Sequence, residues 1–368
     1  MTETQEDLRF WLALLHAPGV GPTAFRQLLD QYGTLDALFE QRDPCGTRSS
    51  EALEHYLRDP NWEQVDSNLA WLARDPLNHI LTLRSPAYPV LLRELHDAPP
   101  VLFVHGNPGV LGNLQLAIVG SRNPTAGGIR NAQDFAAHLT NAGLTIASGL
   151  ALGIDAAGHA GALDVKGVTV AVLGTGPDRV YPACHRDLAH QIAEHGALVT
   201  ELAPGAGPRP EHFPRRNRVI SGLSLGTLVV EAAPRSGSLI TARHALEQGR
   251  EVFAIPGSIH NPLARGCHSL IRQGAKLVET ADDILEELGA LAFACQQPSS
   301  ARPPPTSLSD DHAQLLDSMG HDPMPMDLLV ARTGLTAEAV SSMLLILELQ
   351  GYIVSAPGGR YSRIDKRL

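Results

Sequence analysis

The stretch Leu116-Ala-Ile-Val-Gly-Ser-Arg122 joins a short apolar run to a glycine, a hydroxyl group and an arginine. An apolar run of this length bounded by a turn signal is typical of a buried strand, and the helical pattern of 124–141 follows directly. A buried strand that ends in a turn and leads into a helix is the repeating unit of a parallel sheet. This stretch therefore predicts the first strand of an α/β fold.

The same alternation of strand and helix continues to about residue 290. Segments long enough for crossover helices, such as 154–165 and 238–248, separate the apolar runs. The further candidate strands are Leu144–Ala147, Val168–Leu173, Leu198–Thr200, Leu225–Val230, Glu251–Ile255 and Lys276–Val278. We expect a doubly wound, mostly parallel sheet with helices on both faces.

Smaller bodies are predicted on either side of this sheet. Residues 1–78 have apolar side chains at helical spacing, and 297–307 is a Pro/Ser-rich stretch typical of an extended linker. Residues 308–368 have the pattern of a winged helix: helices near 312–319, 326–333 and 337–350, then a strand, a turn and a strand. We expect a helical domain at 1–78, the sheet domain at 79–296 and a winged-helix domain at 308–368.

The turn at Pro18–Thr23 has the outline of a helix-hairpin-helix, whose exposed N–H groups can hold a phosphate. The same glycines can simply close a pair of antiparallel helices. Residues 1–78 hold 13 acidic against 6 basic residues, which favours a plain helical hairpin or a protein-docking role.

Composition excludes several classes of protein. No run reaches the roughly 18 apolar residues of a membrane span, and the first residues are acidic where a signal peptide is basic. The four cysteines show no C-x-x-C spacing. The formal net charge is −10, yet residues 79–296 hold 17 basic and 18 acidic residues and can present a basic face. We expect a soluble cytoplasmic protein with no membrane segment, no metal and no cofactor.

Three strand–loop–helix turns, called elbows here, are rich in glycine and serine. Backbone N–H groups and the helix dipole at such turns favour an anion, and carboxyl ends of parallel strands share one edge of a sheet. The predicted phosphate-binding residues are Gly120, Ser121 and Arg122 in the first elbow, Ser148, Gly149 and Gly153 in the second, and Ser236, Gly237 and Ser238 in the third. We expect a row of phosphate sites that accepts a polyanion.

The segment Phe213-Pro-Arg-Arg-Asn-Arg218 begins a further helix with three arginines in four residues. Arg215 and Arg218 share one face, Arg216 projects separately, and together with Asn217 they form a candidate arginine clamp on phosphates. A solvated charged face is the alternative. Phe213, with Tyr181 elsewhere in the chain, is a candidate for base stacking.

We expect Arg122 and Arg216 to make the stronger phosphate contacts. Replacing either is expected to leave folding unaffected, because elbow and helix-start positions are predicted to lie outside the core.

These blocks resemble the DNA-processing protein A (DprA, also Smf) family. The resemblance rests on the first elbow with its strand, on Ser148–Asp155, on Phe213–Ser224, on Ser236–Ala242 and on Glu247–Gly257, in that order. It implies a Rossmann-like protein that is not an enzyme, binds single-stranded DNA as a homodimer and hands the strand to the RecA recombinase during natural transformation. Where the family usually has Gly-x-Asn-x-Leu-Ile, this chain has Gly266-Cys-His268-Ser-Leu-Ile271.

The competing function is a nucleotide hydrolase that acts on nucleoside monophosphates. Glu231, at the end of a predicted strand, is the candidate catalytic base. Related Rossmann hydrolases carry a Pro-Gly-Gly-x-Gly-Thr-x-x-Glu loop, and the corresponding segment Pro234–Arg243 lacks both the glycine pair and the glutamate.

Other short motifs give weaker indications of function. Asp155 and His159 stand four residues apart, as in an acid–base or metal pair, although helix packing or capping explains them as well. The adjacent pairs Cys184-His185 and Cys267-His268 lack metal-ligand spacing. A double-stranded-DNA repressor needs a basic reading helix, and 337–350 contains no Lys or Arg.

Overall fold

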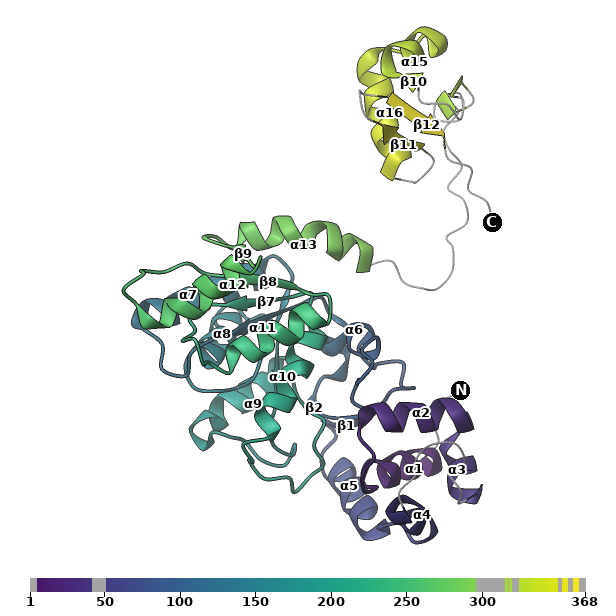
Figure 1. Cartoon of the computed structure of the whole chain (residues 1–368), viewed down its shortest axis with the longest axis vertical. Helices are drawn as coiled ribbons and strands as arrows, with labels where there is room; N and C mark the ends of the chain where they lie inside the picture. The colour runs from purple at the N-terminus through teal and green to yellow at the C-terminus, as the bar shows by residue number, and fades with distance from the viewer. Residues whose placement is uncertain are drawn as a thin grey trace. The chain divides into compact units, whose positions relative to one another are not determined.

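The computed structural model describes residues 5–41, 51–295, 315, 316, 318, 319, 324–349, 353–356 and 360–363. The chain divides into two compact units, Met1–Gln297 and Pro298–Leu368, which are coloured along the chain in Figure 1. The expected linker at 297–307 lies outside the described residues. The expected boundary at residue 78 falls inside the first compact unit and stays a prediction.

The centre of the first unit is a twisted sheet that, among the described residues, has nine strands in the order β1-β2-β6-β5-β4-β3-β7-β8-β9. The strands are β1 (Asn78–Thr82), β2 (Val101–Gly106), β3 (Gln115–Val119), β4 (Thr145–Ser148), β5 (Thr169–Val172), β6 (Ala197–Thr200), β7 (Gly226–Val229), β8 (Glu251–Ala254) and β9 (Lys276–Leu277). From β6 to β9 every neighbouring pair is parallel, which confirms the predicted mostly parallel sheet. The antiparallel pairs β1–β2 and β2–β6 at one edge were not predicted.

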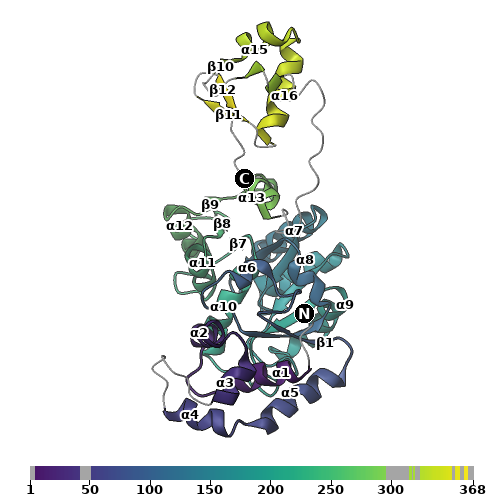
Figure 2. The same ribbon diagram turned by 90° about the vertical axis from the view of Figure 1, so that its right-hand side faces the viewer.

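Helices cover both faces of this sheet, as Figure 2 shows. They are α7 (Ala126–Asn141), α8 (Ile154–Asp164), α9 (Arg186–His195), α10 (His212–Leu223), α11 (Ser238–Glu247), α12 (Arg265–Arg272) and α13 (Asp282–Cys295). Alternate residues of β3 face opposite ways: Leu116 and Ile118 pack with α7, α8 and α13, whereas Ala117 and Val119 join the cluster of α10, α11 and α12. The strand is fully buried because both faces are covered.

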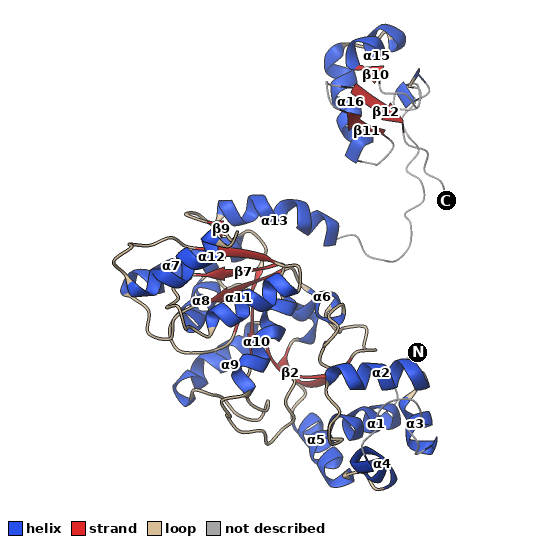
Figure 3. Ribbon diagram, viewed as in Figure 1, coloured by secondary structure: helices blue, strands red, loops and turns tan. Residues whose placement is uncertain are grey.

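The described secondary structure of the N-terminal part is all helical, as predicted, and Figure 3 shows its helices in blue. It comprises α1 (Gln5–Leu15), α2 (Pro22–Tyr32), α3 (Leu35–Gln41), α4 (Glu51–Arg58) and α5 (Trp62–Arg74), and a short α6 (Val90–Arg93) follows β1. Its buried side chains belong to the same apolar cluster as β2. The rings of Trp71 and Phe103 meet edge to face, with centroids 5.7 Å apart. Arg26 of α2 donates to the carbonyls of Arg93 and Leu95, at 3.1 and 2.6 Å.

The second unit contains β10 (Met324–Pro325), α15 (Met326–Thr333), α16 (Ala337–Leu349), β11 (Ile353–Ala356) and β12 (Arg360–Arg363). Gly334 ends α15 in the left-handed conformation, and the three strands form an antiparallel sheet in the order β10-β12-β11. Leu329, Val340 and Leu344 are buried in a core of its own. The predicted helix–turn–helix and wing are thereby confirmed, while half of the helix expected at 312–319 lies outside the described residues.

None of the described helices is long and apolar enough to cross a bilayer.

Candidate nucleic-acid interface

The carboxyl ends of β3 and β7 form the point where the winding of the sheet reverses. The chain proceeds from β3 through β4 and β5 to β6, then returns to place β7 on the other side of β3. Ligands of open α/β sheets bind in the crevice that such a reversal creates. A pocket of about 750 Å³ opens there.

Most of the predicted site residues line this pocket. They are Gly120, Ser121 and Arg122 of the first elbow, Ser236, Gly237 and Ser238 of the third, Arg216 and Asn217 of α10, and the aromatic residues Tyr181 and Phe213. The structure thus brings together residues up to 118 positions apart in the sequence, from Gly120 to Ser238, and the first and third elbows meet as predicted.

The second elbow reaches the pocket through Ala151, but its three predicted residues do not line it as expected. Ser148 is buried and donates to the Ile118 carbonyl at 2.6 Å. The Gly149 N–H donates to Asp155 Oδ2 at 3.1 Å, so a carboxylate of the protein already occupies the position expected for a phosphate. Gly153 is the residue before α8 and is not among the lining residues.

Two of the elbow glycines are required by close packing. A Cβ at Gly120 would lie 2.6 Å from a side-chain carbon of Ile154, and one at Gly149 would collide with the Arg216 guanidinium. These glycines therefore let helices α8 and α10 approach the strand ends, which is a structural reason for glycine independent of any phosphate.

Glu231 is placed as a capping group. Its two carboxylate oxygens accept from the backbone N–H and the hydroxyl of Thr125, at 2.9 and 2.7 Å, directly before α7. Thr125 in turn accepts from the Gly128 N–H at 3.0 Å. A carboxylate at a helix N-terminus is stabilised by the helix dipole. Glu231 is buried and does not line the pocket, so the geometry gives no support to its role as a catalytic base.

The third elbow is joined to α10 across the pocket. The Asn217 amide donates to the Gly237 carbonyl at 3.3 Å, and the hydroxyls of Ser236 and Ser238 lie 2.7 Å apart. Ser236 is half-buried, and Gly237 is exposed at the start of α11. This arrangement leaves a polar rim on the third elbow that faces the pocket.

One wall of the pocket is aromatic and carries a cation. The Tyr181 and Phe213 rings have centroids 5.5 Å apart, and the Arg122 guanidinium carbon lies 5.8 Å from the Phe213 centroid. Tyr181 is 47% exposed, and Arg122 is exposed. The wall therefore offers a stacking surface and a positive charge at the same place.

Arg216 lines the pocket but is buried, contrary to the expectation that it lies outside the core. Its Nη1 group donates to the carbonyls of Gly149, at 2.6 Å, and Val172. Burial lowers the pKa of the guanidinium to about 10, the charge of Asp155 opposes this shift, and that of Arg122 adds to it. Arg216 therefore has a structural role: it connects the ends of β4 and β5 at the floor of the pocket.

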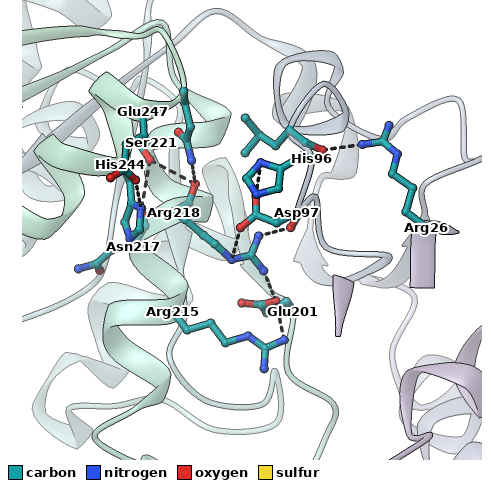
Figure 4. Close-up of polar contacts among 12 residues, drawn as sticks. Arg26, His96, Asp97, Glu201, Arg215, Asn217, Arg218, Ser221, His244 and Glu247 are labelled. Carbon is teal, nitrogen blue, oxygen red and sulfur yellow. Dashed lines mark hydrogen bonds and ion pairs between the residues drawn. The ribbon is translucent and has the colours of Figure 1, made fainter. Parts of the chain in front are cut away.

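Arg218 and Arg215 are not among the pocket-lining residues, and Figure 4 shows both side chains pointing toward Glu201. Arg218 is buried and pairs with Glu201, at 2.6 Å, and with Asp97, at 3.5 Å. Arg215 is half exposed and contacts the same Glu201 oxygen at 3.1 Å. The predicted clamp of three arginines is thus divided between the pocket floor and an internal ion-pair network.

Arg235 is a pocket residue that was not predicted from the sequence. This exposed arginine follows β7 and lines the pocket. The signal was present, because Arg235 directly precedes the Ser-Gly-Ser of the third elbow. Pro208 and Pro210, which also line the pocket, carry no comparable chemical signal.

The residues that the sequence offered as acid–base or metal pairs contact other groups and not each other. Asp155 accepts from the second elbow, whereas His159 contacts the Thr169 hydroxyl at 2.7 Å. Cys267 is buried with its thiol toward the Val229 carbonyl, and His268 contacts the backbone of Gly257. Within the described part of the chain, no three His, Cys, Asp or Glu side chains are arranged to hold a metal ion.

Comparison with known proteins gives consistent matches. The family model described as DNA recombination-mediator protein A matches residues 79–289, and that of the DprA winged helix domain matches 299–359. Protein Smf of Escherichia coli is 40% identical over 98% of this chain and 96% of that protein. DNA processing protein DprA of Bacillus subtilis is 46% identical over 56% of this chain and 70% of that protein.

Solved structures agree with these matches. The structure of DprA from Streptococcus pneumoniae superposes with a TM-score of 0.67 at 38% identity, covering 76% of this chain and 97% of that one. A DprA structure from Helicobacter pylori, described as showing a single-stranded DNA binding mode, matches with a TM-score of 0.52 at 27% identity, covering 58% and 96%. This chain belongs to the DprA/Smf family of DNA-processing proteins.

Proposed function

We propose that this chain is a recombination mediator that binds single-stranded DNA in the pocket between the first and third elbows and acts without catalysing a reaction. One observation carries the proposal: exposed Arg122 lies over Phe213 at the mouth of a pocket whose rim is formed by serine and glycine. Arg235 adds a second exposed cation. The single-stranded DNA binding named for the Helicobacter pylori relative supports the same ligand.

A single strand fits this chemistry better than a duplex. Arginine and backbone N–H groups hold phosphates without regard to sequence, and an aromatic wall stacks on any base that is not already paired. Base-edge readout in a duplex needs donors on an exposed helix, and the sequence of α16 supplies no Lys or Arg. We therefore infer binding that depends little on sequence and strongly on salt.

The test is a titration of labelled oligo-dT and of a matched duplex at several salt concentrations. We expect tighter binding to the single strand and an affinity that falls steeply as salt rises. Equal affinity for both ligands, or a flat salt dependence, would refute the proposed ligand.

The absence of turnover is a separate part of the proposal. Glu231 caps α7 and lies outside the pocket lining, so we expect no release of base or phosphate from nucleoside monophosphates or ATP. The alternative, a Rossmann-type hydrolase, would be supported by product above background that disappears in Glu231→Ala.

We further propose that the chain acts as a homodimer that protects incoming DNA and loads RecA on it during natural transformation. The family membership supports this role, and two pockets on one strand would gain avidity through effective concentration. The test coats a single strand with single-strand-binding protein and follows RecA filament formation with and without this chain. No acceleration at any stoichiometry would exclude the loading role, and a monomer by light scattering would exclude the avidity argument.

A further inference from the structure

The second elbow contains an anion that the protein supplies itself. Asp155 lies in the first turn of α8, is 7% exposed and lines the pocket. Its Oδ2 atom accepts from the N–H groups of Gly149 and Ala151, at 3.1 and 3.4 Å. Backbone N–H groups beside a helix N-terminus are the arrangement that holds a phosphate in other α/β proteins.

Asp155 interacts electrostatically with residues of the proposed DNA site. Burial raises the pKa of its carboxyl, and the charges of Arg216 and Arg122 oppose that shift. The charges that act on this carboxyl come from two elements, Arg216 on α10 and Arg122 in the first elbow. The two arginines that act on Asp155 include the exposed one proposed to hold DNA.

We infer that the Asp155 carboxylate is an internal competitor for the anion-binding groups of the pocket and limits its affinity for single-stranded DNA. The inference rests on the proposed function, because it concerns the same pocket. The carboxylate occupies the N–H groups of the second elbow and offsets part of the positive charge of Arg122 and Arg216. A strand phosphate entering the pocket therefore meets a like charge at its floor.

A limited affinity suits a protein that passes its strand to another. Affinity among related complexes is set mostly by the dissociation rate, so a nearby like charge shortens the residence time of the strand. In this proposal Arg122 and the aromatic wall bind the strand, and the charge of Asp155 increases the rate at which the strand dissociates.

The experiment compares oligo-dT binding by the wild-type chain, Asp155→Asn and Asp187→Asn. Asp187 is the matched control, because it is an exposed aspartate in the first turn of α9 and does not line the pocket. We expect Asp155→Asn to bind on the order of fivefold more tightly, as expected for one like charge removed at a partly screened distance, and to release the strand more slowly. We expect Asp187→Asn to bind like the wild type.

The outcomes separate the two hypotheses. A wild-type chain that does not bind oligo-dT refutes the proposed function. A wild-type chain that binds, with Asp155→Asn equal or weaker at an unchanged melting temperature, refutes the role of Asp155 alone. Damage to the pocket weakens binding, so a gain in affinity is an outcome that a merely structural role does not produce.

A second measurement covers the case in which the variant does not fold. In the wild-type chain, the ¹³C signal of the Asp155 carboxyl is followed against pH with and without saturating oligo-dT. Because coupling between two sites is reciprocal, a phosphate near Asp155 must raise the midpoint of that titration. An unchanged midpoint would overturn the inference.

Discussion

The guanidinium of Arg122 lies over the ring of Phe213, with 5.8 Å between the guanidinium carbon and the ring centroid. Arg122 follows β3, and Phe213 is in the first turn of α10, so the contact joins two elements at the mouth of the pocket. The arginine keeps its charge exposed while its side chain is restrained by the ring.

We expect Arg122→Ala to weaken oligo-dT binding by about 1–3 kcal/mol, the usual size of a charge-assisted phosphate contact. The side chain is exposed, so the melting temperature should stay close to that of the wild type. Fluorescence anisotropy gives the affinity. Arg130→Ala on α7, also exposed but outside the pocket lining, is the matched control, and equal affinities for the two variants would remove Arg122 from the site.

Phe213 and Arg122 are expected to act together. Phe213→Leu should lose about 1–3 kcal/mol of binding, because a leucine cannot stack on a base. In a double-mutant cycle with Arg122→Ala, the two losses should fall short of adding, with a coupling on the order of 0.5–1 kcal/mol from the cation–π contact. Simple additivity would mean that each side chain contacts the strand independently of the other.

Arg216→Ala should destabilise the fold, contrary to what the sequence suggested. The guanidinium is buried, and its Nη1 donates to two strand-end carbonyls. Removing it leaves these two buried carbonyls without their donor and takes away a charge that stabilises the Asp155 carboxylate, which costs about 1–3 kcal/mol in the free energy of unfolding. Urea denaturation measures this loss. A variant as stable as the wild type would contradict the buried placement.

His159 should make stability depend on pH. Burial lowers its pKa from the ordinary 6.5 to about 3, so between these values the unfolded chain binds a proton that the folded chain excludes. Stability from this group is therefore fully present above pH 6.5 and is lost as pH falls toward 3, by about 1.4 kcal/mol per pH unit. His159→Gln should flatten the curve of unfolding free energy against pH in this range. Exposed His195→Gln should leave the curve unchanged, and a His159→Gln curve as steep as that of the wild type would assign the dependence to other groups.

A chain ending at Cys295 should keep most of its affinity for oligo-dT, within about threefold, because the removed unit has a separate core and can fold apart from the first. The truncated chain retains α13, whose Ile284 and Leu288 pack in the core of the sheet. Circular dichroism checks the fold and anisotropy the binding. Precipitation, or loss of most of the affinity, would show that the second unit takes part in holding DNA.

The parallel part of the sheet could be predicted because its strands are short apolar runs separated by segments long enough for crossover helices. The edge strands β1 and β2 end differently: β2 is antiparallel to both of its neighbours and is followed by no crossover helix. The apolar run Val101–Val104 is typical of a strand, but no helical segment follows it, so a search for strands followed by crossover helices does not find it.

The site was predictable to the extent that it depends on strand order. The first and third elbows belong to β3 and β7, which are neighbours in the sheet, so their meeting follows from the fold. The burial of Arg216 does not follow from local sequence, because its partners Gly149 and Val172 lie 67 and 44 positions away. Three arginines in four residues look alike in a sequence, whereas long-range packing gives each a different environment.

The edge-to-face contact of Trp71 with Phe103 has an evolutionary consequence. Helices α1–α5 share one apolar cluster with β2, so the helical N-terminal part is not an interchangeable attachment to the sheet. A lineage that lost these helices would expose Phe103 and its neighbours to water, and it could persist only by replacing them with polar residues or by recruiting another cover. Gain or loss of this part is therefore tied to compensating change in the strand beneath it.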